Sequence, residues 1–190
     1  DRMSNESDLR SRFGPKATAE NGERPKLAIV VGTQVLEQSL DIDFDVMVMD
    51  IAPVDLIMQR LGRVHRHRRG KEERNRPEKL RHAVCCIRGI DTRQNGLPEF
   101  AKGIDSVYFA ATLMEALAVL GLTEEKNSVR LSLPEDIAAL VRCAYSDTIG
   151  AKIPQRWKED WRQACDDRTS ENSRKISRSK TCMLRSVRKM

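Results

Sequence analysis

Two short segments of this sequence carry residue types that suit phosphate chemistry. The first, residues 32–43, opens with Gly32-Thr33 and ends with two aspartates. Backbone N–H groups beside a glycine, together with a threonine hydroxyl, suit a phosphate oxygen, and Asp41, eight residues after Thr33, suits a sugar hydroxyl. Gly-Thr at a strand end is also a common turn, so this segment taken alone has an ordinary structural explanation.

The second segment, residues 59–66, reads Gln-Arg-Leu-Gly-Arg-Val-His-Arg. Arg63 and Arg66 are three residues apart, so one helical turn directs both guanidinium groups to the same side. Two guanidinium forks directed at one place suit a polyphosphate, although an arginine pair on a helix is usually solvated. The two segments together indicate a function more specifically than either does alone, because they occur in this order after two consecutive apolar runs.

Three short apolar runs predict the strands that position these segments: residues 27–31, 46–49 and 83–87. Each run is uninterrupted, which is typical of parallel strands buried on both faces. Ligands of such sheets gather at the carboxyl ends of the strands, and the polar stretches 32–45 and 50–66 both leave a strand at that end. We therefore expect a site at the carboxyl edge of the sheet.

Helical spacing follows the strands. Pro53 suits the first turn of a helix, and apolar residues continue at helical spacing for two turns after it. Residues 103–120 predict a long helix, a second begins at Pro134, and Trp157 and Trp161 share a face of a third, most simply as packing anchors. Strands alternating with helices predict an α/β fold, here the latter part of an α/β domain followed by a helical extension.

Composition limits the class of protein. Of the 190 residues 39% are hydrophobic, enough to form a core, whereas the 4% that are aromatic are too few for a base-stacking surface. No apolar run approaches the roughly 20 residues of a membrane span. Five cysteines, an odd number without framework spacing, indicate reduced thiols and a cytoplasmic location. These features argue against a membrane protein and against a disulfide scaffold.

The formal net charge of +6 is concentrated in two runs. Eight Lys/Arg and two Glu lie between residues 60 and 76, and seven Lys/Arg and one Glu lie between residues 171 and 190. The second run is typical of a solvated, flexible tail. In the first run, by contrast, the first three arginines stand at fixed spacing behind an apolar segment, which indicates that they have defined positions.

We expect no metal site. His65 and His67 could be combined with Cys85 and Cys86, but zinc ligands normally come as spaced pairs. Adjacent cysteines on a strand point to opposite faces, so these two cannot bind one ion together.

Taken together, the two segments resemble motifs V and VI of superfamily 2 helicases, which lie in the second of two paired RecA-like domains. The residues of the two segments are most similar to those of the CRISPR-associated helicase-nuclease of type I interference systems. The similar stretches are residues 31–45, VGTQVLEQSLDIDFD; residues 50–67, DIAPVDLIMQRLGRVHRH; and residues 133–145, LPEDIAALVRCAY. The resemblance is strong over residues 26–67 and loose over residues 103–161.

This resemblance implies a partial RecA-like parallel sheet, of the P-loop NTPase type, with a helical C-terminal extension. It assigns Gly32, Thr33 and Gln34 to the nucleic-acid backbone, although Gly32 stands where the family more usually has alanine. Asp41 would face the ribose of the nucleotide. Contact with the backbone and not with the bases predicts salt-sensitive, sequence-tolerant binding of single-stranded DNA.

For catalysis, the resemblance implies a site for ATP and Mg²⁺. Gln59 would lie beside the γ-phosphate and the attacking water, with Arg63 and Arg66 as arginine fingers, so that all three are catalytic and contact the nucleotide. Arginine fingers neutralise the charge that develops on the transferred phosphoryl group, an effect of about 10³–10⁵ in rate.

The sequence lacks two motifs that hydrolysis also requires. A phosphate loop has the pattern Gly-x-x-x-x-Gly-Lys-Ser/Thr, whereas Gly70-Lys71 is followed by Glu72. An acidic pair for magnesium is also missing, as is the His-Asp dipeptide of that family's nuclease domain. We therefore expect that this chain alone neither hydrolyses ATP nor cuts DNA. It would supply half of a composite site, with the Mg²⁺ ligands N-terminal to Asp1 or on a partner chain.

The expected organisation has four parts: a polar lead-in or linker at residues 1–26, the second RecA-like helicase domain at 27–122, a helical extension at 123–165, and a basic, flexible tail at 166–190. The leading functional hypothesis is the C-terminal part of an ATP-dependent single-stranded DNA helicase of CRISPR antiviral defence. It would work with an N-terminal helicase domain of the same parent protein and with an RNA-guided surveillance complex.

Two alternatives remain open. One is another superfamily 2 helicase that acts on a different nucleic acid. The other is a non-catalytic nucleic-acid-binding remnant, which salt-dependent single-strand binding without any effect of nucleotide would favour.

Overall fold

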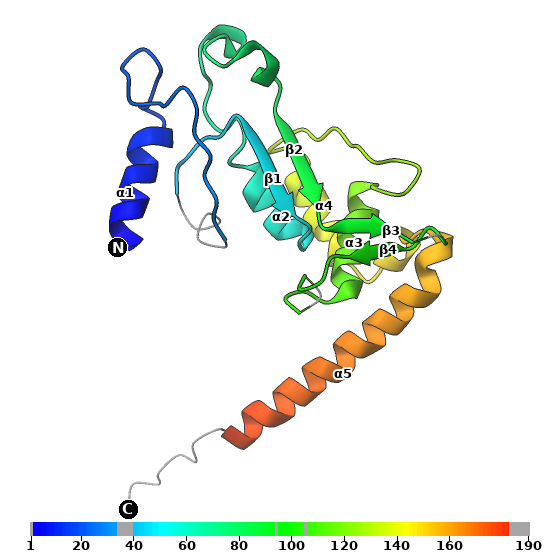
Figure 1. Cartoon of the computed structure of the whole chain (residues 1–190). Helices are drawn as coiled ribbons and strands as arrows, with labels where there is room; N and C mark the ends of the chain where they lie inside the picture. The colour runs from blue at the N-terminus through cyan, green and yellow to red at the C-terminus, as the bar shows by residue number, and fades with distance from the viewer. Residues whose placement is uncertain (1, 34–39, 94, 105, 183–190) are drawn as a thin grey trace, which may run out of the picture.

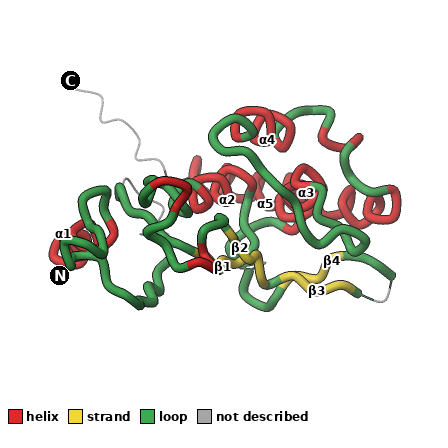
Figure 2. The backbone as a smooth tube through the Cα atoms, turned by 90° about the horizontal axis from the view of Figure 1, so that it is seen from above, coloured by secondary structure: helices red, strands yellow, loops and turns green. Residues whose placement is uncertain are grey.

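The computed structural model describes residues 2–33, 40–93, 95–104 and 106–182 (Figure 1). The helices are α1 (Arg2–Phe13), α2 (Val54–Leu61), α3 (Ala110–Leu120), α4 (Ile137–Ala144) and α5 (Lys158–Cys182). The strands are β1 (Val46–Asp50), β2 (Val84–Arg88), β3 (Ile90–Thr92) and β4 (Pro98–Phe100). Helices α2, α3 and α4 lie on one side of the strands, and α5 projects away from the body (Figures 1 and 2).

Strands β1 and β2 pair in parallel, with Val46 opposite Val84 and Val48 opposite Cys86. The α/β class and the strands predicted at residues 46–49 and 83–87 are therefore confirmed. The predicted burial of these strands on both faces is not confirmed. Val46, Val48 and Val84 point away from the helices and are 44%, 62% and 45% exposed, because all the covering helices lie on the opposite face.

The strand predicted at residues 27–31 is absent: the described chain from residue 27 to residue 33 forms neither a helix nor a strand. Leu27, Ile29 and Val31 are 85–93% exposed, while Val30 packs against the small apolar cluster of Phe13 and its neighbours. An apolar run identifies residues that can be buried, but a strand also needs a second strand beside it. A short antiparallel pair, β3 with β4, was not anticipated from the sequence.

Helix α3 is shorter than predicted. It begins at Ala110 and not near residue 103, because Phe109 before it is extended, with φ −64° and ψ 136°. At its end Gly121 takes the left-handed conformation, with φ 67°, which a glycine adopts without strain and which commonly terminates helices. Eight of its eleven residues are buried, so α3 is the central helix of the core.

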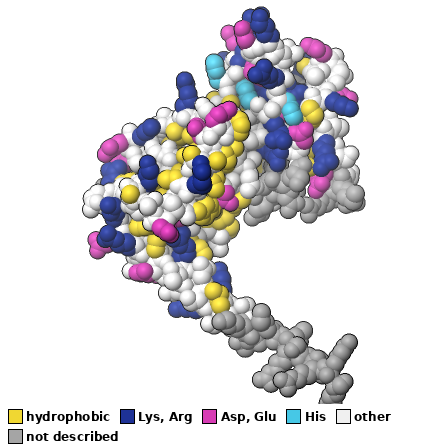
Figure 3. All heavy atoms as spheres, turned by 180° about the vertical axis from the view of Figure 1, so that it is seen from behind, with side chains coloured by type: hydrophobic (Ala, Val, Ile, Leu, Met, Phe, Trp, Pro, Cys, Tyr) yellow, Lys and Arg dark blue, Asp and Glu magenta, His cyan; other side chains and the backbone are white. Residues whose placement is uncertain are grey.

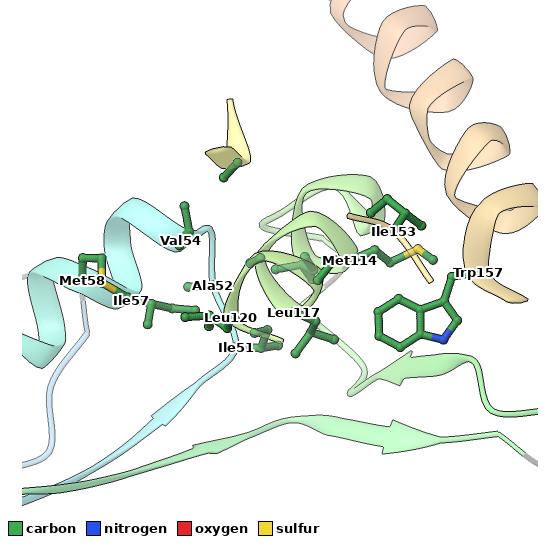
Figure 4. Close-up of a cluster of buried hydrophobic side chains, with 14 of the residues drawn as sticks. Ile51, Ala52, Val54, Ile57, Met58, Met114, Leu117, Leu120, Ile153 and Trp157 are labelled. Atoms are coloured by element: carbon green, nitrogen blue, oxygen red, sulfur yellow. The ribbon is translucent and has the colours of Figure 1, made fainter. Parts of the chain in front are cut away.

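The main core lies between α2, α3 and the start of α5 (Figure 4). Trp157 is 2% exposed, and its indole N–H donates to the carbonyl of Gly96 at 2.9 Å. Trp161 packs against the same core and donates to Glu115 Oε1 at 3.1 Å. Both tryptophans are therefore packing anchors, as predicted.

Helix α5 continues to Cys182, so residues 166–182 are helical where a flexible tail was expected; residues 183–190 lie outside the described part. An anchor explains the difference. Arg168 donates to both carboxylate oxygens of the buried Glu115, at 2.9 and 3.0 Å, and Lys175 Nζ lies 5.3 Å from the ring centroid of Phe109. At the other end of the chain, α1 occupies part of the lead-in that was expected to be polar and linker-like.

Candidate functional site

The two segments singled out by the sequence lie side by side. Phe44 N–H donates to the carbonyl of Arg63 at 2.8 Å, and His65 N–H donates to the carbonyl of Phe44 at 3.0 Å, which forms an isolated parallel bridge between Phe44 and Val64. This bridge is two residues before β1, so the site lies at the amino end of the strand. The expected carboxyl-edge position was wrong, since α2 carries the chain back along the sheet before Arg63.

Asp41 and Arg66 form a direct ion pair across the two segments. Arg66 Nε donates to Asp41 Oδ1 at 2.6 Å, and His67 Nε2 lies 3.0 Å from the same oxygen. The hydrogen bond from Arg66 is the main reason that the pKa of Asp41 lies below its ordinary value, against the opposing effect of burial. Both side chains remain about half exposed, so a ligand can reach this pair.

Arg63 lies close to the same pair in a less solvated position. Burial, and then the charge of Arg66, lower the pKa of Arg63, while Asp41 opposes them. Its Nε is buried and has no hydrogen-bond partner among the described residues, and the same is true of His65 Nε2. A buried donor left unpaired beside a second cation is unfavourable unless an acceptor arrives, which makes this position suitable for an anionic group.

The other predicted site residues are less closely connected. Gln59 is exposed on α2, and Gly32 and Thr33 are exposed in the irregular stretch after Val30. Gln34 lies outside the described residues. The structure therefore brings Asp41, Arg63 and Arg66 together and leaves the position of the remaining residues relative to them as a prediction.

A buried ionic cluster next to the site was not anticipated from the sequence. It consists of Asp43, Arg69 and Arg76, which are 0%, 5% and 3% exposed. Asp43 accepts from Arg69 Nε at 2.9 Å and from Arg76 Nη2 at 3.0 and 3.1 Å. Burial would raise the pKa of Asp43, but the hydrogen bonds from Arg76 and Arg69 outweigh it, and the pKa lies below its ordinary value of 3.8.

The cluster ties three stretches of chain together. The Arg69 guanidinium donates to the carbonyls of Gly14 and Ala17 at 3.0 and 2.7 Å, which fastens the turn after α1. Arg76 donates to the carbonyl of His67 at 2.8 Å and also pairs with Asp45. The expectation that only the first arginines of the 60–76 run have defined positions was too narrow. The missed signal was the pair of aspartates, Asp43 and Asp45, that supplies the counter-charge.

Charged side chains are spread over the visible face, the visible histidines lie on its upper lobe, and an apolar band crosses the body (Figure 3). Within the described ranges, no helix is both long enough and apolar enough to cross a bilayer.

The adjacent cysteines differ as expected. Burial, as the main cause, raises the pKa of Cys85 to about 11, whereas Cys86 is exposed.

Residues 1–69 match the family described as CRISPR-associated nuclease/helicase Cas3, C-terminal. The CRISPR-associated nuclease/helicase Cas3 of Streptococcus thermophilus is 37% identical over 155 residues, which are 82% of this chain and 14% of that protein. A crystal structure of T. fusca Cas3-ADP matches 97% of this chain and 19% of that one, with 28% identity and a TM-score of 0.73. Similar values, 29% identity, a TM-score of 0.69, and 97% and 20% coverage, are found for a chain in the structure of a CRISPR RNA-guided surveillance complex, pre-nicking.

A helix-covered parallel strand pair, together with these structural neighbours, defines a RecA-like helicase region. The chain spans between a seventh and a fifth of the length of the proteins it matches. It belongs to the Cas3 family of CRISPR-associated nuclease/helicases and corresponds to part of the C-terminal helicase region of that family.

Proposed function

We propose that this chain supplies the arginine half of a composite ATP site in a Cas3-type, ATP-driven single-stranded DNA helicase. The observation that supports it most directly is the arrangement of Asp41, Arg63 and Arg66. Two guanidinium groups from one loop lie beside a partly exposed carboxylate, and the Nε of the more buried one, Arg63, has no hydrogen-bond partner among the described residues. Such a site fits an anion with several oxygens better than it fits a neutral ligand.

In this proposal Arg63 and Arg66 contact the triphosphate of ATP as arginine fingers, and Gln59 orients the attacking water. Asp41 accepts from the ribose and also from Arg66 Nε, at 2.6 Å. One structural neighbour is a complex of Cas3 with ADP, which supports nucleotide use in the family. The phosphate loop and the Mg²⁺ ligands would come from the N-terminal helicase domain of the same parent protein, because hydrolysis needs both.

The proposed nucleic-acid contacts are Gly32, Thr33 and Gln34, which would meet the backbone of single-stranded DNA. Asp41 follows Thr33 by eight residues in the sequence, so loss of the phosphate would alter the affinity for the strand and turn hydrolysis into movement. We further propose a cytoplasmic protein recruited by an RNA-guided surveillance complex, and a division at residue 122 between the second RecA-like domain and the helical extension.

Substitution of the arginines tests the proposal in a full-length helicase of this family whose C-terminal helicase region is this chain. Arg63→Ala and Arg66→Ala should each lower kcat for DNA-stimulated ATP hydrolysis by about 10³-fold or more, with little change in folding. Arg68→Ala is the matched control, since Arg68 is an exposed arginine of the same loop with no proposed role. Equal kcat values for all three variants would overturn the proposal.

The chain alone offers a second test. It should show no magnesium-dependent ATPase, and an activity that Arg63→Ala abolishes would refute the composite site. Single-strand binding by the chain should weaken steeply with salt. If nucleotide never alters strand binding in the full-length protein, the non-catalytic remnant becomes the better explanation.

A further inference from the structure

The loop that carries the two proposed arginine fingers contains one residue with an unusual backbone conformation. Hydrogen bonds to the segment before β1 hold this loop in place. His65, between Arg63 and Arg66, has φ 50°, a left-handed conformation that residues other than glycine adopt infrequently and that carries a cost in conformational free energy. Such a conformation persists only where its surroundings hold it in place.

Three hydrogen bonds hold the backbone of residues 63–67 against the segment before β1. Phe44 provides two of them, through its N–H to the carbonyl of Arg63 and its carbonyl to the N–H of His65. The third comes from a side chain: Asp43 Oδ1 accepts from the backbone N–H of His67 at 3.2 Å. Asp43 therefore fixes the residue directly after Arg66, and its neighbour Phe44 fixes Arg63 and His65.

Asp43 is itself immobilised. Its backbone N–H donates to the carbonyl of Phe13 at 2.9 Å, and its side chain, with no exposed surface, is held by Arg69 and Arg76. Arg76 also donates to the carbonyl of His67, so the peptide groups on both sides of the His67 α-carbon are bound by one cluster. A charge-assisted bond in a buried setting is stronger and better directed than a solvated one.

We propose that Asp43 is the positioning residue for Arg63 and Arg66, holding the loop so that both guanidinium groups face the same phosphate site. The inference rests on the proposed function and deepens it, because it assigns the geometry of the site to a residue that touches neither nucleotide nor DNA. Asp41 and Asp43, two residues apart, have complementary roles. Asp41 holds the Arg66 side chain, and Asp43 holds the backbone that bears it.

The test compares Asp43→Asn with Asp45→Asn in the full-length helicase. Both substitutions remove one carboxylate that pairs with Arg76, but no described hydrogen bond joins Asp45 to residues 63–67. Misplacement of catalytic groups by about 1 Å can lower the rate by about 10²-fold. Asp43→Asn should therefore lower kcat for ATP hydrolysis by about 10²-fold with KM for ATP changed less than about threefold, whereas Asp45→Asn should retain kcat.

Loss of folding is separated from loss of positioning by a second variant, Asp43→Leu/Arg69→Met. It removes both charges of the buried pair together, which buried ion pairs often tolerate, and it also removes the acceptor for His67 N–H. A folded double variant with kcat as low as that of Asp43→Asn supports the proposal. A folded double variant with wild-type kcat overturns it, as do equal kcat losses for Asp43→Asn and Asp45→Asn.

Arg63→Ala is measured in parallel. If Arg63→Ala leaves kcat unchanged, the proposed function itself fails. If Arg63→Ala lowers kcat while both Asp43 variants keep it, the arginine fingers remain and only the positioning role of Asp43 is lost.

Discussion

Two regions of this molecule are held together by different forces. The region around the candidate site, residues 40–45 and 63–76, depends on buried charge: Asp43 at 0% exposure is surrounded by arginines. The helical region built on α3 and the start of α5 depends on apolar packing around Leu113 and Trp157. Buried ion pairs are directional and costly to break, whereas apolar packing is non-directional and tolerates small displacements.

This difference matches what each region has to do. Two cations such as Arg63 and Arg66 repel each other, so holding them together needs directional bonds to the backbone around them. The helical region only has to provide a stable platform, and burial of α3 on nearly all sides is sufficient for that. A loop that bears adjacent like charges is therefore supported by ionic contacts, next to a core that depends mainly on apolar ones.

The greatest loss of stability is expected in the apolar region. Trp157→Ala removes a side chain that is 2% exposed and leaves a cavity between α3 and α5, so it should lower the free energy of unfolding by about 3–5 kcal/mol. Urea unfolding of the chain followed by circular dichroism measures this loss. Val48→Ala, on the exposed face of β1, should change it by no more than about 0.5 kcal/mol; comparable losses would show that Trp157 is not a core anchor.

A smaller effect is expected at the ion pair between Arg168 and Glu115 in the helical region. Arg168→Met removes the donor pair from Glu115, whose own exposure is only 4%. Because Arg168 itself is partly exposed, the loss should be about 1–3 kcal/mol. Arg174→Met is the control, since the ion pair of Arg174 with Glu171 is long, at 3.9 Å, and exposed. Greater stability of Arg168→Met than of the wild type would contradict the role of this pair as an anchor for α5.

Acid should weaken the site region through Asp43. Its pKa is lower in the folded chain than the ordinary 3.8, so the ionised carboxylate stabilises the fold fully above that value. The contribution is lost as the pH falls through the lowered pKa. The free energy of unfolding of the wild type should therefore fall relative to that of Asp43→Leu/Arg69→Met between about pH 5 and pH 2. Parallel pH profiles of the two proteins, from urea midpoints, would refute this.

The weakest effect concerns a bond at the border between the two regions. Tyr145 O–H donates to Asp55 Oδ1 at 2.7 Å. Burial, followed by this bond, raises the pKa of Tyr145 to about 12. The contribution to stability is present below the ordinary value of 10.0 and is lost as the pH rises through the raised one. Because Tyr145 is largely exposed, Asp55→Asn should cost no more than about 1 kcal/mol.

A titration followed by ultraviolet absorbance measures the ionisation of the Tyr145 phenol directly. Of the two tyrosines in the chain, Tyr108 is removed by Tyr108→Phe, so that the remaining titration belongs to Tyr145. Its midpoint should lie near 12 and move down when Asp55→Asn is added. An unchanged midpoint would mean that Asp55 does not influence the phenol.

The sequence predicted the parts of the fold that depend on local pattern. Apolar runs located β1 and β2, and helical spacing located α2 and the two tryptophan anchors. It failed where pairing decides the outcome. Residues 27–31 have strand-like composition but no adjacent strand in the described structure, and Arg69 and Arg76 are buried only because Asp43 and Asp45 approach from the other segment.

In the candidate site, too, the sequence missed what depends on contacts between segments. The sequence predicted that one helical turn brings Arg63 and Arg66 together, but α2 ends at Leu61. Arg66 reaches Asp41 from a loop in which His65 is left-handed. The location of the two arginines at the amino end of β1 could not be predicted, because it depends on α2 running back along the sheet. The left-handed His65 has no sequence signal, since that conformation is imposed by bonds to Phe44 and Asp43.

The parallel register of β1 and β2 has one more consequence, for covalent labelling. Cys86 lies on the outer face beside Val48, while its neighbour Cys85 faces the helices with a thiol pKa of about 11. An alkylating reagent at neutral pH reacts with the thiolate, so it should modify Cys86 and spare Cys85. Two consecutive thiols thus form an internal pair of probe and reference, and the rate at which Cys86 is alkylated reports whether anything covers the outer face of the sheet.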